Sequence, residues 1–283
     1  MKCEFFNNAG GLVDVAGPFL AEDEAENTVL LGHARRRVHR PRSDAVMAAV
    51  HDGDAVRLVA MMLPPHALVL SARGPDGIPC LVAALRAAGV GPPGVVGIEP
   101  IAERFAALWR GRESPAAEAE MRTILYRADH IAAPGNVPGE LRPASDHDLE
   151  WLAGWQRRFA QQASLSTAER AADMRAVVAA RIARGEMYVW AVEGRPVASA
   201  AFIPTAPAGD AGRINAVFTL EEERGRGYAS AGVAALSRRL LDRGWRYCLV
   251  FADRGNPITT RMYPRLGYQE VARFATIGLR GDR

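Results

Sequence analysis

The fold is decided by one stretch of the sequence, VFTLEEERGRGYA, which runs from Val217 to Ala229. It begins as an apolar strand, turns through a short acidic loop and enters a helical pattern with two glycines at the junction. Glycine lets the backbone adopt positive φ and approach a ligand closely. The first N–H groups of a helix have no partner inside the helix, and together with the helix dipole they form an anion site. The stretch therefore predicts a strand, a loop that holds a pyrophosphate, and a helix.

An alternation of helical and extended patterns surrounds this stretch in the second half of the chain. Helices are expected at about 146–162, 167–184, 229–243 and 257–265. Strands are expected at about 187–192, 197–203, 214–219 and 247–252, with a turn at 193–195 and a final strand pair between 269 and 279. This order predicts a mixed α/β fold, in which a central sheet is flanked by helices.

The first half of the chain repeats this order. Strands are expected at 45–51, 55–62, 67–71, 95–98 and 121–131, and helices at 78–88 and 101–110. The segment that starts at Ala67, ALVLSARGPDGIPCLVAALRAAG, parallels the one that starts at Ala216. We interpret this as an internal duplication, with two dissimilar α/β domains as the alternative. A segment rich in proline and glycine, 132–141, separates the halves and predicts domains at 1–135 and 140–283.

Two motifs of the second half resemble those of the GNAT superfamily of N-acetyltransferases. The acetyl-CoA signature of that family, R/Q-x-x-G-x-G/A, is matched by Arg224, Gly227 and Ala229. Its downstream pattern, N-x-x-S/T-x-x-x-Y and then G-F/Y, is matched from Asn256 to Tyr263 and by Gly267-Tyr268. The resemblance covers about residues 142–280, whereas the first half shares only the coarse layout. It implies two tandem GNAT-like domains.

The resemblance also implies acetyl-CoA as cosubstrate and assigns roles to single residues. The backbone of Val217 and Thr219 would bind the pantetheine, the amides that begin at Arg224 would hold the pyrophosphate, and Asn256 would contact the pantetheine arm. The expected cofactor-binding residues are Val217, Phe218, Thr219, Arg224, Gly225, Arg226, Gly227, Tyr228, Ala229, Ser230 and Asn256. As an alternative, Arg224 and Arg226 are plain solvated charges. We interpret the acidic run 221–223 as a solvated face of the loop rather than a catalytic cluster.

Tyr263 would stand near the thioester sulfur and protonate the departing thiolate. A thiolate whose conjugate acid has a pKa of about 8.5–10 is matched by a phenol with a pKa of about 10. The alternative is that the ring of Tyr263 only packs in the core. Pro264 follows directly and is expected to disturb the helix there.

The acetyl group would pass to an amine, on a small molecule or a peptide, by direct attack in a ternary complex. The general base is not assigned. Asn215 and Ala216 occupy positions where many relatives carry a carboxylate, and no histidine follows His147. A water chain ordered by Asn215, or a carboxylate from elsewhere, would then take the proton of the amine.

The first half lacks the phosphate loop. At the corresponding place it has a shorter segment, 71–77, in which Pro75 removes an amide donor and Asp76 would repel a phosphate. We therefore expect the domain 1–135 to be degenerate and non-catalytic and to shape the acceptor pocket, while 140–283 is catalytic. A catalytically idle acyl-CoA sensor is the alternative function for the chain as a whole.

Composition and charge limit which other classes of function and which cell compartment are expected. The net charge of +3 is too small to argue for nucleic acid, and the basic run 33–42 lacks aromatic neighbours, so a nucleic-acid-binding module is the less favoured alternative. Three distant cysteines offer no disulfide framework and no zinc spacing, and no metal is expected. Neither a secretory signal nor a membrane span is expected, since the most apolar stretch, 58–70, is short and interrupted. We expect a cytoplasmic protein.

Overall fold

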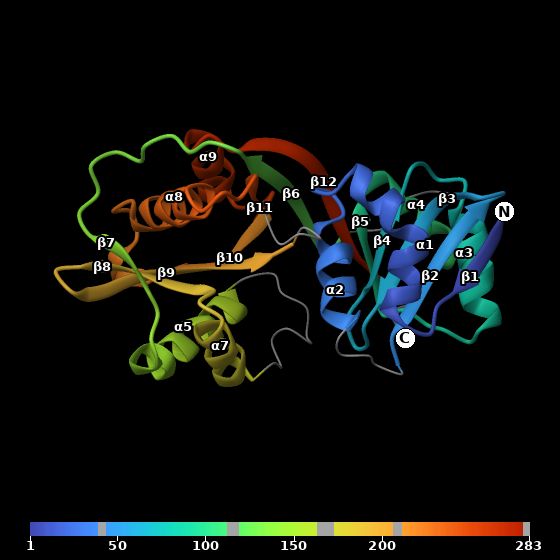
Figure 1. Ribbon diagram of the computed structural model, residues 1–283, viewed down its shortest axis with the longest axis horizontal. Helices are drawn as coiled ribbons and strands as arrows, with labels where there is room; N and C mark the ends of the chain where they lie inside the picture. The colour runs from blue at the N-terminus through green and yellow to red at the C-terminus, as the bar shows by residue number, and fades with distance from the viewer. Residues whose placement is uncertain (39–43, 112–118, 163–172, 206–210, 280–283) are drawn as a thin grey trace. The chain divides into compact units, whose positions relative to one another are not determined.

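The computed structural model describes residues 1–38, 44–111, 119–162, 173–205 and 211–279 and divides into two compact units. Unit 1 comprises Met1–Ile124 together with the end of the chain from Ala272 on, and unit 2 comprises Leu125–Val271. Each unit is a mixed sheet with helices on its faces (Figure 1). The mixed α/β fold predicted from the sequence is confirmed.

The elements of unit 1 follow the order strand, two helices, three strands, helix, strand, helix. They are β1 (Lys2–Phe5), α1 (Ala9–Glu22), α2 (Thr28–Val38), β2 (Val46–Asp52), β3 (Ala55–Met62), β4 (Leu68–Ala72), α3 (Ile78–Ala87), β5 (Gly94–Ile98) and α4 (Glu99–Trp109). Neighbouring strands are antiparallel from β1 to β4, and β4 and β5 are parallel. One buried core lies between the sheet and α3 and α4, and another lies between the sheet and α1 and α2.

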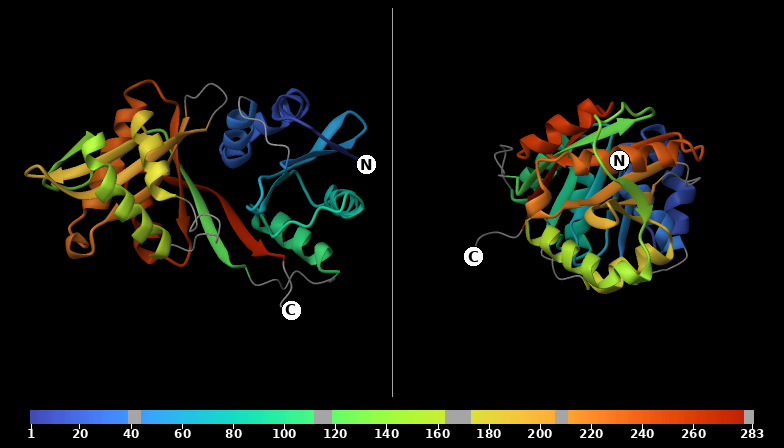
Figure 2. Two further views of the ribbon diagram at one scale, coloured as in Figure 1. Left: turned by 90° about the horizontal axis from the view of Figure 1, so that it is seen from below. Right: turned by 90° about the vertical axis from the view of Figure 1, so that its left-hand side faces the viewer.

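Unit 2 repeats this order. Its elements are β7 (Glu140–Pro143), α5 (Leu149–Gln162), α7 (Met174–Ala183), β8 (Met187–Val192), β9 (Arg195–Pro204), β10 (Ala211–Thr219), α8 (Tyr228–Leu241), β11 (Tyr247–Asp253) and α9 (Pro257–Arg265). Short 3₁₀ turns lie at Asp146–Asp148 and Glu221–Glu223. α5 and α7 cover one face of the sheet, and α8 and α9 cover the other (Figures 1 and 2).

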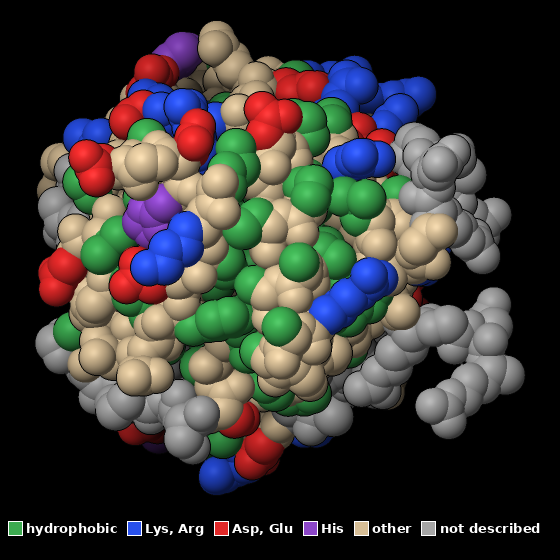
Figure 3. Space-filling view, turned by 90° about the vertical axis from the view of Figure 1, so that its right-hand side faces the viewer, with side chains coloured by type: hydrophobic (Ala, Val, Ile, Leu, Met, Phe, Trp, Pro, Cys, Tyr) green, Lys and Arg blue, Asp and Glu red, His purple; other side chains and the backbone are tan. Residues whose placement is uncertain are grey.

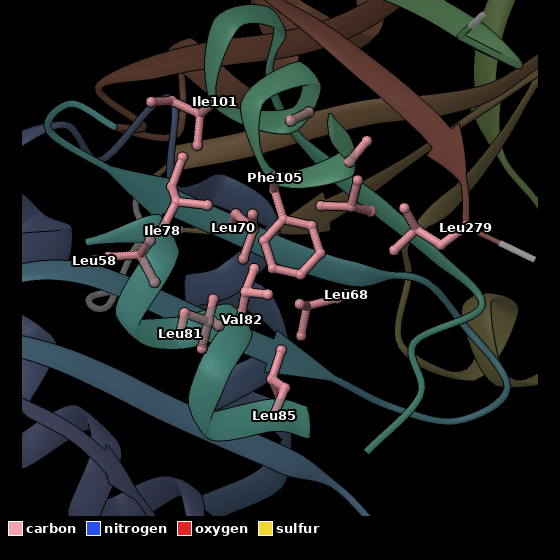
Figure 4. Packing of buried hydrophobic residues seen from close by; sticks show 14 of the residues in the cluster. Leu58, Leu68, Leu70, Ile78, Leu81, Val82, Leu85, Ile101, Phe105 and Leu279 are labelled. Carbon is pink, nitrogen blue, oxygen red and sulfur yellow. The ribbon is translucent and has the colours of Figure 1, made fainter. Parts of the chain in front are cut away.

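The last strand of each half of the sequence completes the sheet of the other unit. β6 (Met121–Ala128) ends in unit 2 as the neighbour of β11, and β12 (Gln269–Gly278) ends in unit 1 as the neighbour of β5. From Phe274 to Gly278, β12 pairs antiparallel with β5. Ile277 and Leu279 are buried, and the side chain of Leu279 lies in the core of unit 1 near Phe105 and Leu68 (Figure 4).

Several expected elements differ from the observed ones. The final strand pair predicted between 269 and 279 is wrong, because β12 is one continuous strand whose polar first half is solvent-exposed. β1, α1, α2 and β7 had not been predicted; β7 begins within the segment interpreted as a linker. Of the helix expected at 167–184, the part from Met174 on is observed, and 163–172 lie outside the described residues.

The core contribution of β12 gives a first prediction. Ile277→Ala removes a fully buried side chain and should lower the free energy of unfolding by about 2–5 kcal/mol. Hydrogen exchange should then become faster at the amides of Gly94–Ile98, which pair with β12, and not in β8. Ile258→Ala is the control, since the side chain of Ile258 is 75% exposed. Unchanged protection of β5 in Ile277→Ala would contradict the role given to β12.

Candidate functional site

A fork opens between the parallel strands β10 and β11 in unit 2. The strands are paired from Ala211–Tyr247 to Ile214–Val250, and the pairing ends there. Immediately beyond, the register of β10 against β9 shifts between Asn215 and Phe218, and Ala216 has a positive φ of 52°. Such a bulge bends a strand and increases its twist. The backbone of 215–219 therefore leaves β11.

Two side chains support the bulge from the face that α5 and α7 cover. The buried Gln156 of α5 donates from Nε2 to the carbonyl oxygen of Ala216 at 3.4 Å. Arg181 of α7 donates from Nη1 to Oδ1 of Asn215 at 3.1 Å. Neither residue was predicted from the sequence. Gln156 had a visible signal, because it lies beside Trp155 on the apolar face of its helix.

The loop after β10 ends in left-handed glycines. Gly225 has φ 80° and Gly227 has φ 83°, a backbone region that other residues rarely adopt. Gly227 is the N-cap of α8 and provides no capping side chain. Within the described residues, none of the N–H groups from Gly225 to Ser230 donates a hydrogen bond. The predicted strand, glycine loop and helix are present, and the loop presents a row of unused donors at a helix N-terminus.

Glu223 holds this loop to the hairpin between β8 and β9. Its side chain is only 4% exposed, and its carboxylate accepts a hydrogen bond from Arg195, the first residue of β9. The other carboxylate oxygen, Oε2, lies 3.1 Å from Nη1 of Arg226. The interpretation of 221–223 as a solvated face is therefore wrong for Glu223, although Glu221 and Glu222 are exposed. Two guanidinium groups compensate for the burial of this carboxylate.

Tyr263 lies on α9 and is 3% exposed. Its ring contacts those of Tyr126 and Tyr268, with centroid distances of 5.9 and 5.7 Å. Its hydroxyl makes no hydrogen bond within the described residues, so it is available to a ligand. Burial raises the pKa of Tyr263 well above that of a free phenol, which keeps the hydroxyl protonated as a donor.

Three further residues of the predicted site region are Pro264, Asn256 and Phe218. The disturbance expected at Pro264 is not observed, because α9 continues to Arg265 and Pro264 lies in its last turn. Asn256 is the N-cap of α9, and its Oδ1 accepts from the N–H groups of Ile258 and Thr259. Only its Nδ2 is thus left for a pantetheine arm. Phe218 packs against Trp155 at a centroid distance of 5.8 Å, so its side chain belongs to the core.

The comparisons agree with this geometry. Residues 147–268 match the Acetyltransferase (GNAT) family. The matched stretch is less than half of the chain and lies within unit 2. Within the part of the chain that the structure describes, no helix is long and apolar enough to cross a membrane, and no cluster of three potential metal ligands is present.

Solved structures extend the likeness to both units. An acetyltransferase from the GNAT family of Colwellia psychrerythraea is 11% identical, with a TM-score of 0.62, and 99% of this chain and 100% of that one are covered. A tandem GNAT protein from the clavulanic acid biosynthesis pathway is 12% identical, with a TM-score of 0.57 and full coverage of both chains. At these identities the likeness shows the fold alone. No curated protein matches the chain.

The surface gives the nucleic-acid alternative no support on the face of unit 1 shown in Figure 3. The Lys and Arg side chains coloured there are separated by hydrophobic and acidic ones and do not form a continuous stripe (Figure 3). Of the basic run 33–42, α2 contains the residues up to Val38, and 39–42 lie outside the described residues. A nucleic-acid site requires a connected basic surface.

Proposed function

We propose that unit 2 transfers an acetyl group from acetyl-CoA to an amine acceptor. The observation that carries the proposal is the fork at Ala216, which leads directly into a loop of unused amides. A pyrophosphate at the amides of 225–230 would be stabilised by their convergent N–H groups and by the dipole of α8. A pantetheine arm that runs from Thr219 back to Asn215 would then place its thioester at the closed end of the fork.

The reaction would take place in a ternary complex. The acceptor loses a proton to become a neutral amine, and its nitrogen attacks the carbonyl carbon of the thioester. The new C–N bond forms, the C–S bond breaks and the thiolate leaves. The nitrogen then releases its surplus proton to solvent, which gives the neutral amide. Tyr263 would give the thiolate its proton and recover one from solvent, because its hydroxyl is protonated and engaged in no other hydrogen bond within the described residues.

In unit 1 the corresponding strands β4 and β5 are paired from Leu68–Val95 to Val69–Val96, and the segment that follows β4 differs from the loop of unit 2. The N–H of Ile78, the first residue of α3, donates to the carbonyl of Pro75, and the next residue is Pro79, which has no N–H. The cavity next to these strands, lined in part by Glu26, Ser71 and Phe274, has a volume of about 10 Å³. That is room for at most a single water molecule. These features support the proposal that domain 1–135 does not bind acetyl-CoA.

We therefore expect one molecule of acetyl-CoA to bind per chain. Titration calorimetry with acetyl-CoA should give a stoichiometry of one, and hydrogen exchange should show protection at 225–230 and none at 71–78. A stoichiometry of two, or protection at α3, would contradict the proposal that unit 1 binds no acetyl-CoA. An absence of binding would overturn the proposed function.

Catalysis is tested separately from binding. A panel of amines on small molecules and peptides is offered with acetyl-CoA, and release of the free thiol is measured. Turnover of any acceptor supports the enzyme, whereas tight binding of acetyl-CoA without turnover would favour the idle acyl-CoA sensor.

A further inference from the structure

The glycine loop, residues 224–227, has few constraints of its own. Gly225 and Gly227 both have positive φ and lie on either side of Arg226. Glycine loses more conformational freedom on ordering than any other residue. Within the described residues, the backbone N–H groups of 225–227 donate no hydrogen bond. The conformation that presents these amides therefore depends on contacts from outside the segment.

One side-chain contact reaches the middle of the glycine loop. Nη1 of Arg226 lies 3.1 Å from Oε2 of Glu223, as an ion pair without hydrogen-bond geometry. Among the described residues, the side chain of Arg226 makes no other hydrogen bond or ion pair. The place of Arg226 between the two glycines is therefore set by the carboxylate of Glu223.

Glu223 is in turn fixed by the neighbouring hairpin. Its side chain is 4% exposed, and its Oε1 accepts a hydrogen bond from Nη2 of Arg195, the first residue of β9. The two-residue turn Glu193-Gly194, in which both residues have positive φ, joins β8 to β9. Turns of this kind match the twist of the strands and are the favoured short connection of a hairpin. Arg195 thus provides a well-ordered anchor.

These contacts connect β9 to the glycine loop through a latch of three side chains, Arg195, Glu223 and Arg226. The carboxylate of Glu223 loses its hydration on burial, and the two guanidiniums offset that cost. A buried ionic group of this kind adds little net stability compared with apolar packing. The latch is better explained by the loop conformation that it fixes.

We infer that Glu223 is a positioning residue for the cofactor and that Arg195 acts through it. The latch holds the glycine loop in its binding conformation before the cofactor arrives, so less conformational entropy is lost on binding. The inference rests on the proposed function, because the ligand of the loop is the pyrophosphate of acetyl-CoA. The negative charge of Glu223 by itself opposes an anion. Positioning and charge thus change the affinity in opposite directions.

Titration calorimetry of Glu223→Gln with acetyl-CoA measures which effect is larger. The substitution keeps the shape of the side chain and removes its charge, so that Arg226 is released. We expect Kd to rise about tenfold, the effect of ordering roughly one more residue on binding. The amide of Ala231, which donates to the carbonyl of Gly227, should also exchange faster in the free variant, because the start of α8 loses its support.

Two other carboxylates of unit 2 provide matched controls. Glu222→Gln removes the same charge from an exposed neighbour of Glu223 and should leave Kd unchanged or slightly lower. Asp148 is 4% exposed and is bound by Arg142 through hydrogen bonds of 2.7 and 2.8 Å. Asp148→Asn should lower the melting temperature about as much as Glu223→Gln does, without a change in Kd. This control separates lost stability from lost positioning.

A double-variant cycle tests whether Arg195 acts through Glu223. Arg195→Met should weaken the binding of acetyl-CoA in the same direction as Glu223→Gln. The protein that carries both substitutions should bind no more weakly than Glu223→Gln alone, because both changes open the same latch. Arg195→Lys keeps the charge and should retain most of the affinity.

Every other outcome contradicts the inference. An unchanged or lower Kd for Glu223→Gln would show that the charge of Glu223 only opposes the cofactor. Losses that multiply in the double variant would show that Arg195 contacts the phosphates directly. An equal rise in Kd for Glu222→Gln or Asp148→Asn would show that the effect is not specific to the latch. In all these cases the parent protein binds acetyl-CoA and the proposed function stands; it fails, and the inference with it, only if the parent binds none.

Discussion

A Gly227→Glu variant is expected to bind acetyl-CoA at least about 100-fold more weakly than the parent protein. A carboxylate about 5 Å from a pyrophosphate costs roughly 3 kcal/mol at an intermediate effective dielectric constant, which corresponds to this factor. A Cβ at position 227 would also come within 3.2 Å of Cγ2 of Val137. Titration calorimetry measures the change in Kd.

Two variants separate this effect from strain. Gly244, just beyond the other end of α8, has φ 88°, and no atom lies within 4 Å of the position that a Cβ would take there. Gly244→Glu therefore has the same backbone strain away from the site. Gly227→Gln keeps the bulk and removes the charge, and should bind more tightly than Gly227→Glu. Equal affinity of Gly227→Glu and the parent, with an intact melting transition, would show that the loop does not hold the pyrophosphate.

The glycine loop could be predicted from the sequence because its signal is local. Positive φ at Gly225 and Gly227, the end of a strand and the start of a helix all lie within a few residues of one another. The strand that completes each sheet could not be predicted in this way. The apolar pattern at the end of β12 predicts a buried strand. It does not identify the partner strand, β5, which lies more than 170 residues earlier in the sequence.

The same difference separates the predicted part of the site from the missed part. Arg224 to Ser230 form one continuous segment. Gln156 and Arg181, in contrast, come from two different helices and reach the bulge of β10 only through the packing of α5 and α7 on the sheet. α1 was missed for a local reason. Three glycines and Pro18 lie within its 14 residues, and such residues ordinarily weaken a helix, which here is stabilised by burial of Leu12 and Leu20.

The substitution Tyr263→Phe should lower kcat by about 10²–10⁴, the range expected for loss of a general acid, with little change in the affinity for acetyl-CoA. The ring of Tyr263 is buried between Tyr126 and Tyr268, and Tyr263→Phe keeps these contacts while removing only the hydroxyl. Because that hydroxyl has no partner within the described residues, its removal leaves no buried group unsatisfied and should hardly change the melting temperature.

The pH profile provides a second readout of the same residue. Since burial raises the pKa of Tyr263 above its value of about 10 in water, the phenol stays protonated throughout the neutral and mildly alkaline range, and its ionisation should not reduce kcat below about pH 10. The folded state holds this proton more tightly than the unfolded state does. The free energy of unfolding should therefore fall only as the pH rises beyond about 10. Steady-state kinetics and calorimetry of Tyr263→Phe decide between the two roles: a kcat within about twofold of the parent would assign Tyr263 to core packing alone.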